Sequence, residues 1–214
     1  MDAMPMTTLP DEHVIRDEAT LTALYGEVSA GAIAKEIDYV HPHYAAMIAA
    51  SPFMMLATSG PEGLDASPRG DPAGFVHIAD ERTLLIPDRR GNNRIDSLRN
   101  IVRDPRVALL FLIPGCGETL RVNGRAQIST APDLLGRFEF RGTLPRSVIV
   151  VTVESIYFQC PKAIVRSELW NPAKHISRKS LPSTGTIIGD ITAGRMGGAQ
   201  YDREYPERLR QTLY

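Results

Sequence analysis

Arginine residues are concentrated in one short stretch of the sequence. Residues 82–106 contain seven arginines and three aspartates, whereas the whole chain of 214 residues has a formal net charge of -1. At the centre of this stretch a predicted strand passes into a predicted helix, through a turn that contains Asp88, Arg89, Asn92, Asn93 and Arg94. Guanidinium groups, free backbone N–H groups and the positive end of a helix dipole together bind phosphate. A second interpretation is open, in which an asparagine caps the helix and the arginines are solvated.

A second candidate segment lies at the end of another predicted strand. It contains Ser67, Pro68, Arg69 and Gly70. A small hydroxyl, a rigid turn and a guanidinium group can line an anion pocket. The residues alone favour the simpler alternative, a turn with an exposed arginine, because surface arginines are common.

A third group contains Lys162, Arg166 and Trp170. The two cationic residues are four positions apart and therefore share a face of a predicted short helix, with the tryptophan one turn further on. A cationic face beside an indole suits a phosphorylated aromatic ligand. The alternative, which the residues alone favour, is a half-buried tryptophan with the two long side chains packed around it.

Patterns for several other chemistries are missing. His41 and His43 have no carboxylate or cysteine at ligand spacing, so no metal site is expected. The sequence contains no nucleophile elbow, Walker loop or dinucleotide fingerprint. Cys116 and Cys160 are too few for a disulfide framework, and Cys116 has no evident base nearby. The near-neutral charge argues against a nucleic-acid partner.

The elements that must position these groups are mainly strands. Seven apolar or alternating runs predict strands, at residues 53–58, 64–67, 75–78, 83–86, 107–113, 120–128 and 147–158. Helical spacing is found at residues 18–25, 30–37, 41–50, 92–103 and 131–140. Because strands and helices do not alternate regularly, an antiparallel barrel with flanking helices is favoured over a doubly wound sheet.

The length suits one domain with terminal extensions. We expect an N-terminal helical extension at residues 1–50, the barrel at residues 51–170 and an irregular C-terminal tail at residues 171–214. No run of residues is long and apolar enough to span a bilayer, and the start of the sequence does not have the pattern of a signal peptide. A cytoplasmic protein without a membrane partner is expected.

The order of the motifs resembles the pyridoxamine 5'-phosphate oxidase-related family of FMN-binding split barrels. The resemblance covers roughly residues 30–170 and rests on the segments Ser67–Gly70, Leu85–Arg94, Leu98–Asn100, Asp104–Val107, Glu118–Ala126 and Cys160–Trp170. It is closest to one subgroup of FMN-dependent proteins within the family. It does not extend to the C-terminal segment that pyridoxamine phosphate oxidases use for their substrate, so oxidation of a vitamin B6 phosphate is not expected.

The resemblance implies a homodimer of six-stranded antiparallel split barrels, with FMN in clefts at the subunit interface. The FMN-binding residues it implies are Ser67, Pro68, Arg69, Gly70, Asp88, Arg89, Asn92, Asn93 and Arg94. The partner subunit would add Lys162, Arg166 and Trp170, and Thr119 and Arg121 would approach the flavin ring.

An FMN-dependent oxidoreductase acting on a small organic substrate is therefore expected. The sequence has no evident acid–base residue, which a flavin enzyme can tolerate because the cofactor carries the redox chemistry. The same lack keeps a second hypothesis open, a flavin-binding sensor, carrier or store without turnover. The substrate and the electron donor are not readable from the sequence.

Overall fold

The computed structural model describes residues 9–214, which form two compact units, residues 9–35 and residues 36–214. The first unit contains a short 3-10 helix at Asp11–His13, α1 at Glu18–Tyr25 and α2 at Ala30–Ala34. The Asp17 carboxylate accepts a hydrogen bond from the Thr20 backbone N–H at 2.8 Å and so caps α1, whose helical spacing was correctly predicted. Residues 1–8 of the predicted N-terminal extension lie outside the described residues.

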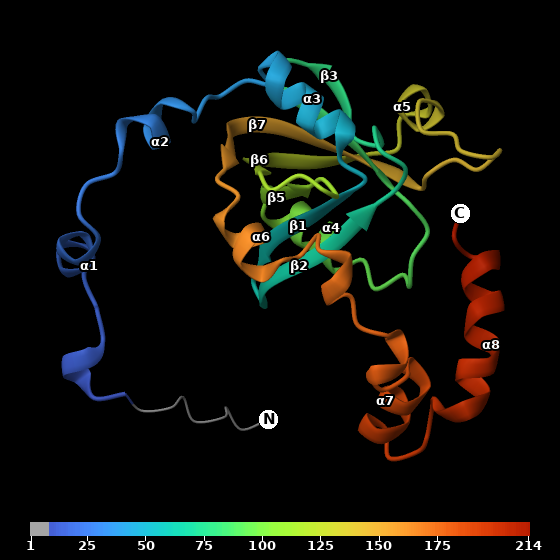
Figure 1. Ribbon diagram of the computed structural model, residues 1–214. Helices are drawn as coiled ribbons and strands as arrows, with labels where there is room; N and C mark the ends of the chain where they lie inside the picture. The colour runs from blue at the N-terminus through green and yellow to red at the C-terminus, as the bar shows by residue number, and fades with distance from the viewer. Residues whose placement is uncertain (1–8) are drawn as a thin grey trace. The chain divides into compact units, whose positions relative to one another are not determined.

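The second unit is built on one sheet of seven strands (Figure 1). The strands are β1 Phe53–Gly60, β2 Gly63–Gly70, β3 His77–Asp80, β4 Thr83–Asp88, β5 Arg106–Leu112, β6 Thr119–Ser129 and β7 Ser147–Gln159. Their order across the sheet is β2-β1-β5-β6-β7-β4-β3, and every neighbouring pair is antiparallel. Six of the seven predicted runs correspond closely to strands, and the run predicted at residues 75–78 is shifted, because β3 begins only at His77 and extends to Asp80. The count of six came from the family resemblance and is one strand short.

Alternation along the central strands explains the core. In β5 the side chains of Val107, Leu109 and Phe111 are buried while their neighbours are more exposed. These residues belong to one hydrophobic cluster with side chains from β1, β4, β6 and β7. A smaller cluster joins Leu85 of β4 to Phe138 and to Val148 of β7. The core therefore lies against the middle of the sheet, and the ends of β2 and β4 are left free for a site.

Six helices complete the second unit. Their bounds are α3 Pro42–Ala50, α4 Asp96–Arg103, α5 Pro132–Gly136, α6 Lys162–Ser167, α7 Thr184–Ile191 and α8 Gly198–Gln211. The side chains of Tyr44 and Ile48 in α3 are buried in the main cluster, so this helix is part of the same compact unit as the sheet. Two short 3-10 helices lie at Pro172–Lys174 and Arg178–Ser180. No helix in residues 9–214 is both long enough and apolar enough to cross a membrane.

The C-terminal tail expected to be irregular at residues 171–214 instead contains α7 and α8, which pack together as a helical hairpin (Figure 1). The Ser183 hydroxyl caps α7 by accepting from the Thr186 N–H at 3.0 Å. Asp202 of α8 accepts from the Gly185 N–H at 2.8 Å, which joins the two helices. Capping and close packing thus form helices where the many glycines favoured a loop.

Candidate functional site

A cavity of about 640 Å³ lies where β2 ends beside the segment that joins β4 to α4. Its volume is within the range of cofactor and small-molecule sites. The residues that line it are Asp65, Ala66, Ser67, Pro68, Arg69, Gly70, Phe75, Pro87, Asp88, Arg89, Arg90, Gly91, Asn92, Asn93, Arg94, Ile95, Asp96, Ser97, Leu98, Arg146 and Ser147.

All nine residues predicted from the two strand ends lie in this lining. They are Ser67, Pro68, Arg69, Gly70, Asp88, Arg89, Asn92, Asn93 and Arg94. Sequence positions 67–70 and 88–94 come together because β2 and β4 end at the same side of the unit. The structure therefore groups two sets of residues whose individual patterns were each ambiguous.

The other five predicted residues do not line this cavity. Thr119 and Arg121 lie on β6, where the Arg121 guanidinium carbon is 5.5 Å from the centre of the Tyr157 ring. Lys162 and Arg166 are exposed on α6. The Trp170 Nε1–H donates to the Cys116 carbonyl at 2.7 Å, which joins the segment after α6 to the turn before β6. Within this chain, the Trp170 indole has a structural partner.

Arg69 and Asp88 form a largely buried ion pair in the cavity wall. The Arg69 Nη1 donates to the Asp88 Oδ1 at 2.6 Å, and their side chains are 18% and 14% exposed. The Arg69 Nε is also buried, but it has no hydrogen-bond partner among the described residues. Buried N–H groups in folded proteins nearly always find an acceptor. An acceptor atom supplied from the cavity would satisfy this one.

Arg89 is held by a second, deeper carboxylate. Its Nε donates to the Asp71 Oδ2 at 2.7 Å, and its Nη1 donates to the Phe138 carbonyl at 2.7 Å. The Asp71 side chain is only 3% exposed, so the pair is well shielded from solvent. Asp71 does not line the cavity, but it fixes the direction of an arginine that does.

The segment between β4 and α4 is a compact turn rather than the start of a helix. Asn93 and Ile95 have φ angles of 62° and 52°, in the left-handed region, and α4 begins only at Asp96. The Asn92 Oδ1 accepts from the Arg94 N–H at 3.1 Å, and the Asn93 Oδ1 accepts from Arg146 at 3.0 Å. A β-branched residue is rare in this region of φ, and such strain is typical of ligand-binding segments.

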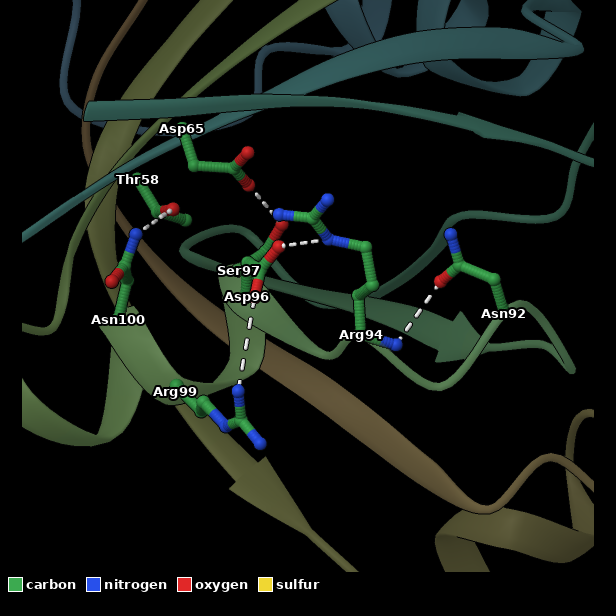
Figure 2. A network of polar contacts seen from close by, with 8 residues as sticks. All are labelled: Thr58, Asp65, Asn92, Arg94, Asp96, Ser97, Arg99 and Asn100. Atoms are coloured by element: carbon green, nitrogen blue, oxygen red, sulfur yellow. Dashed lines mark hydrogen bonds and ion pairs between the residues drawn. The ribbon is translucent and has the colours of Figure 1, made fainter. Parts of the chain in front are cut away.

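The first turn of α4 faces the same cavity. No side chain caps this helix, so its N-terminal N–H groups have no side-chain acceptor within the described residues. The Ser97 hydroxyl donates to the Asp65 Oδ2 at 2.6 Å, which joins the helix to β2, and the Arg94 Nε donates to the Asp96 Oδ2 at 2.8 Å. Figure 2 shows these contacts beside the hydrogen bond from Asn100 to Thr58, which joins α4 to β1.

The charge of the cavity is positive. Five arginines and three aspartates line it, an excess of two positive charges. Each aspartate already has a partner, because Asp65 accepts from Ser97, Asp88 pairs with Arg69, and Asp96 pairs with Arg94. Arginine side chains, an uncapped helix N-terminus and a turn rich in N–H groups together suit an anionic ligand such as a phosphate ester.

Sequence reasoning missed four residues that shape the cavity or its wall: Asp65, Asp71, Ser97 and Arg146. Asp65 was detectable, because it alternates with Ser67 and Arg69 along one face of β2. Arg146 precedes β7, 53 positions away from its partner Asn93, and no local pattern indicates such a contact. In residues 9–214, no group of three potential metal-binding side chains is found.

Comparison with known proteins identifies the family of this chain. The model of the pyridoxamine 5'-phosphate oxidase family matches residues 40–160. No curated protein matches the sequence significantly. Three similar solved structures are HupZ from Group A Streptococcus, general stress protein 26 from Bacillus anthracis and an FMN-binding protein from Syntrophomonas wolfei.

The likeness to these structures is modest. The sequence identities are 18%, 17% and 11%, and the TM-scores are 0.45, 0.41 and 0.42, in the same order. The matched regions cover 54%, 53% and 52% of this chain, and 90%, 88% and 80% of the other chains. The family match itself spans more than half of the chain, from just before α3 to the end of β7, and includes every residue that lines the cavity. The chain therefore belongs to the pyridoxamine 5'-phosphate oxidase family.

Proposed function

We propose that the 640 Å³ cavity binds FMN and that the chain is an FMN-dependent oxidoreductase. The observation that carries this proposal is the buried Arg69 Nε, which lies in the wall of an arginine-lined cavity without a protein acceptor among the described residues. FMN offers what this wall lacks, because it combines a phosphate with a chain and a ring rich in acceptor atoms. Membership of the pyridoxamine 5'-phosphate oxidase family, which agrees with the resemblance to FMN-binding split barrels, supports the same ligand.

The residues fit FMN in distinct ways. Arg94 and the free N–H groups at the start of α4 would hold the phosphate, since helix N-termini and guanidinium groups favour anions. Arg69 would donate its Nε–H to an acceptor atom of the cofactor. Ser67, Asn92 and Asn93 would add neutral hydrogen bonds, while Asp88 holds Arg69 in place. Gly91 has no atom within 4 Å of where a Cβ would be, so the turn itself leaves room for a ligand.

Bound FMN supplies the ability to accept or release a hydride, which no protein side chain has. The task of the protein is to bind and orient the cofactor and to limit the access of water. The three cavity aspartates are consistent with this role of the protein. Each is hydrogen-bonded to an arginine or a serine, so none is free to act as a general base. The substrate class we propose is a small organic molecule. A sensor, carrier or store of flavin would use the same cavity without turnover.

We further propose that two copies of the chain form the complete site, each built as a split barrel. Thr119, Arg121, Lys162, Arg166 and Trp170 lie outside the cavity of their own chain. Lys162 and Arg166 on α6 are exposed and form no ion pair within residues 9–214, so they are available to a second copy. In a symmetric dimer each site would then take its phosphate-binding groups from one chain and its remaining contacts from the other.

The proposal is tested on the purified full-length chain. We expect a visible flavin absorbance spectrum, and a chromophore released on denaturation with the mass of FMN. Addition of NADH or NADPH should bleach the spectrum, and an electron acceptor should restore it at a rate compatible with turnover. A folded protein that neither carries nor takes up FMN would overturn the cofactor assignment. Binding without reduction by any donor would instead favour the storage or sensing role.

A further inference from the structure

The C-terminal hairpin lies outside the residues that match the family, yet the chain that follows it returns to the cavity wall. Tyr214 follows α8, and its phenol Oη donates to the Asp71 Oδ1 at 3.0 Å. Asp71 is the buried carboxylate whose other oxygen accepts from Arg89. A three-residue relay therefore runs from the C-terminal segment, through a carboxylate in the segment after β2, to an arginine of the cavity.

Aromatic packing holds the same residues together. The Tyr214 ring lies 4.6 Å from the Phe140 ring, centre to centre. The Arg89 guanidinium carbon lies 5.9 Å from the centre of each of these rings, within the range of a cation–π contact. Tyr214 also lines a second cavity of about 140 Å³ together with Arg89, Arg90 and Arg146, all three of which line the larger cavity as well.

The relay determines how Arg89 can use its N–H groups. A carboxylate with both oxygens free tends to take an arginine in a two-pronged pair. Because the Tyr214 phenol occupies one oxygen of Asp71, the carboxylate binds Arg89 through Nε, and Nη1 reaches the Phe138 carbonyl. The Arg89 Nη2 group has no hydrogen-bond partner within residues 9–214, and Arg89 lines the cavity.

We propose that Tyr214 is a positioning residue of the cofactor site, acting through Asp71 on Arg89. This inference rests on the proposed function, since it assigns FMN as the ligand that Arg89 meets. It adds that the C-terminal segment, which lies beyond the family match, forms part of the site. Without the phenol, Asp71 turns towards a two-pronged pair with Arg89, and the guanidinium is withdrawn from the cavity.

The test measures FMN affinity in a double-mutant cycle. The dissociation constant of FMN is measured by flavin fluorescence for the wild type, Tyr214→Phe, Arg89→Gln and the double variant. Tyr214→Phe keeps the ring against Phe140 but removes the donor, and we expect affinity to fall about tenfold, the effect of one hydrogen bond to a charged group. In the Arg89→Gln background the same change should have no further effect, because the relay then has nothing to position.

The matched control is Tyr205→Phe, which changes a tyrosine on α8 whose phenol makes no hydrogen bond among the described residues. This variant should bind FMN like the wild type. Circular dichroism and thermal unfolding confirm that each variant is folded. Equal affinity of Tyr214→Phe and the wild type would overturn the inference and leave the proposed function intact. So would additive losses in the cycle, which would show that Tyr214 acts independently of Arg89. A wild type that takes up no FMN would overturn the proposed function and this inference with it.

Discussion

Arg69 and Arg94 line the same cavity but differ in how deeply they are tied into the fold. The Arg69 side chain is 18% exposed and paired with Asp88, whereas the Arg94 side chain is 77% exposed and paired with Asp96 in the adjoining turn of α4. A buried pair has a structural role as well as a binding role. An exposed cation at a ligand site can be removed with little cost to the fold, so the two residues call for different tests.

Replacing Arg94 with alanine should weaken FMN binding without unfolding the protein. Loss of a charge-assisted hydrogen bond costs about 1.5–3 kcal/mol, which corresponds to a dissociation constant raised roughly tenfold to a hundredfold. Thermal unfolding of the FMN-free protein should be unchanged. Arg103→Ala removes the same charge from α4 outside the cavity and should retain FMN. Full retention of FMN by Arg94→Ala would remove this residue from the site.

Replacing Asp88 with alanine should destabilise the FMN-free protein. The change leaves the Arg69 guanidinium largely buried without its carboxylate, and breaking a buried pair from one side costs about 3 kcal/mol. Because both side chains are partly exposed, the expected loss in the free energy of unfolding is about 2 kcal/mol. Urea unfolding measures this loss. Asp38→Ala breaks the ion pair with Arg82, in which both side chains are more than half exposed, and serves as the control. Equal midpoints for the two variants would contradict a structural role of the Arg69–Asp88 pair.

The types of these residues were readable from the sequence, but their partners were not. The density of arginines in residues 82–106 indicated an anion site, and Arg89 and Arg94 do line the cavity. Asp71, which orients Arg89, lies 18 positions earlier in a segment with no motif. A contact between distant segments depends on the path of the chain, which local patterns do not determine.

At the scale of elements, the sequence predicted the positions of the strands more closely than the ends of the helices. The run at residues 147–158 became β7, Ser147–Gln159. The helix predicted at residues 92–103 instead begins at Asp96, because the left-handed residues Asn93 and Ile95 form a turn that side-chain periodicity cannot reveal. The four residues 92–95, predicted to be the first turn of the helix, instead form part of the cavity lining.

The β6–β7 pairing has one position where only glycine fits. At Gly124, beside the irregularity in the ladder, an added Cβ would lie 2.1 Å from the Thr152 carbonyl oxygen. Gly124→Ala must therefore displace backbone in the longest pair of strands, and we expect the free energy of unfolding to fall by about 3 kcal/mol. Gly136→Ala, where no atom lies within 4 Å, should change it little. Equal urea midpoints for the two variants would contradict this role.

At the scale of the whole molecule, the proposed dimer can be tested by complementation. If Arg94 and Arg166 of one site come from different chains, then Arg94→Ala and Arg166→Ala chains should each bind FMN poorly alone. Their random mixing should restore about one site in four, because half of the dimers are mixed and each has one intact site. Flavin content per chain after refolding together measures this. No recovery in a protein that sedimentation shows to be dimeric would contradict the shared site.

The relay also predicts a response of the whole molecule to alkaline pH. Burial, and then the hydrogen bond and charge of Asp71, raise the pKa of Tyr214 above its ordinary value of 10.0, while the charges of Arg141 and Arg89 oppose the shift. The phenol is therefore a donor at every pH below 10, and its contribution to FMN affinity is lost only as pH rises through the raised pKa. Tyr214→Phe should lack this alkaline step in a titration of FMN affinity. The same step in both proteins would assign it to another group.

The hydrogen bond between Tyr214 and Asp71 joins residues 143 positions apart. During synthesis, the strands of the sheet leave the ribosome well before the C-terminal segment, and domains fold as their residues emerge. The sheet can therefore form while the wall that carries Arg89 is still incomplete. Under the proposed function, tight cofactor binding is acquired after the sheet has folded, when the segment that carries Tyr214 packs against Asp71.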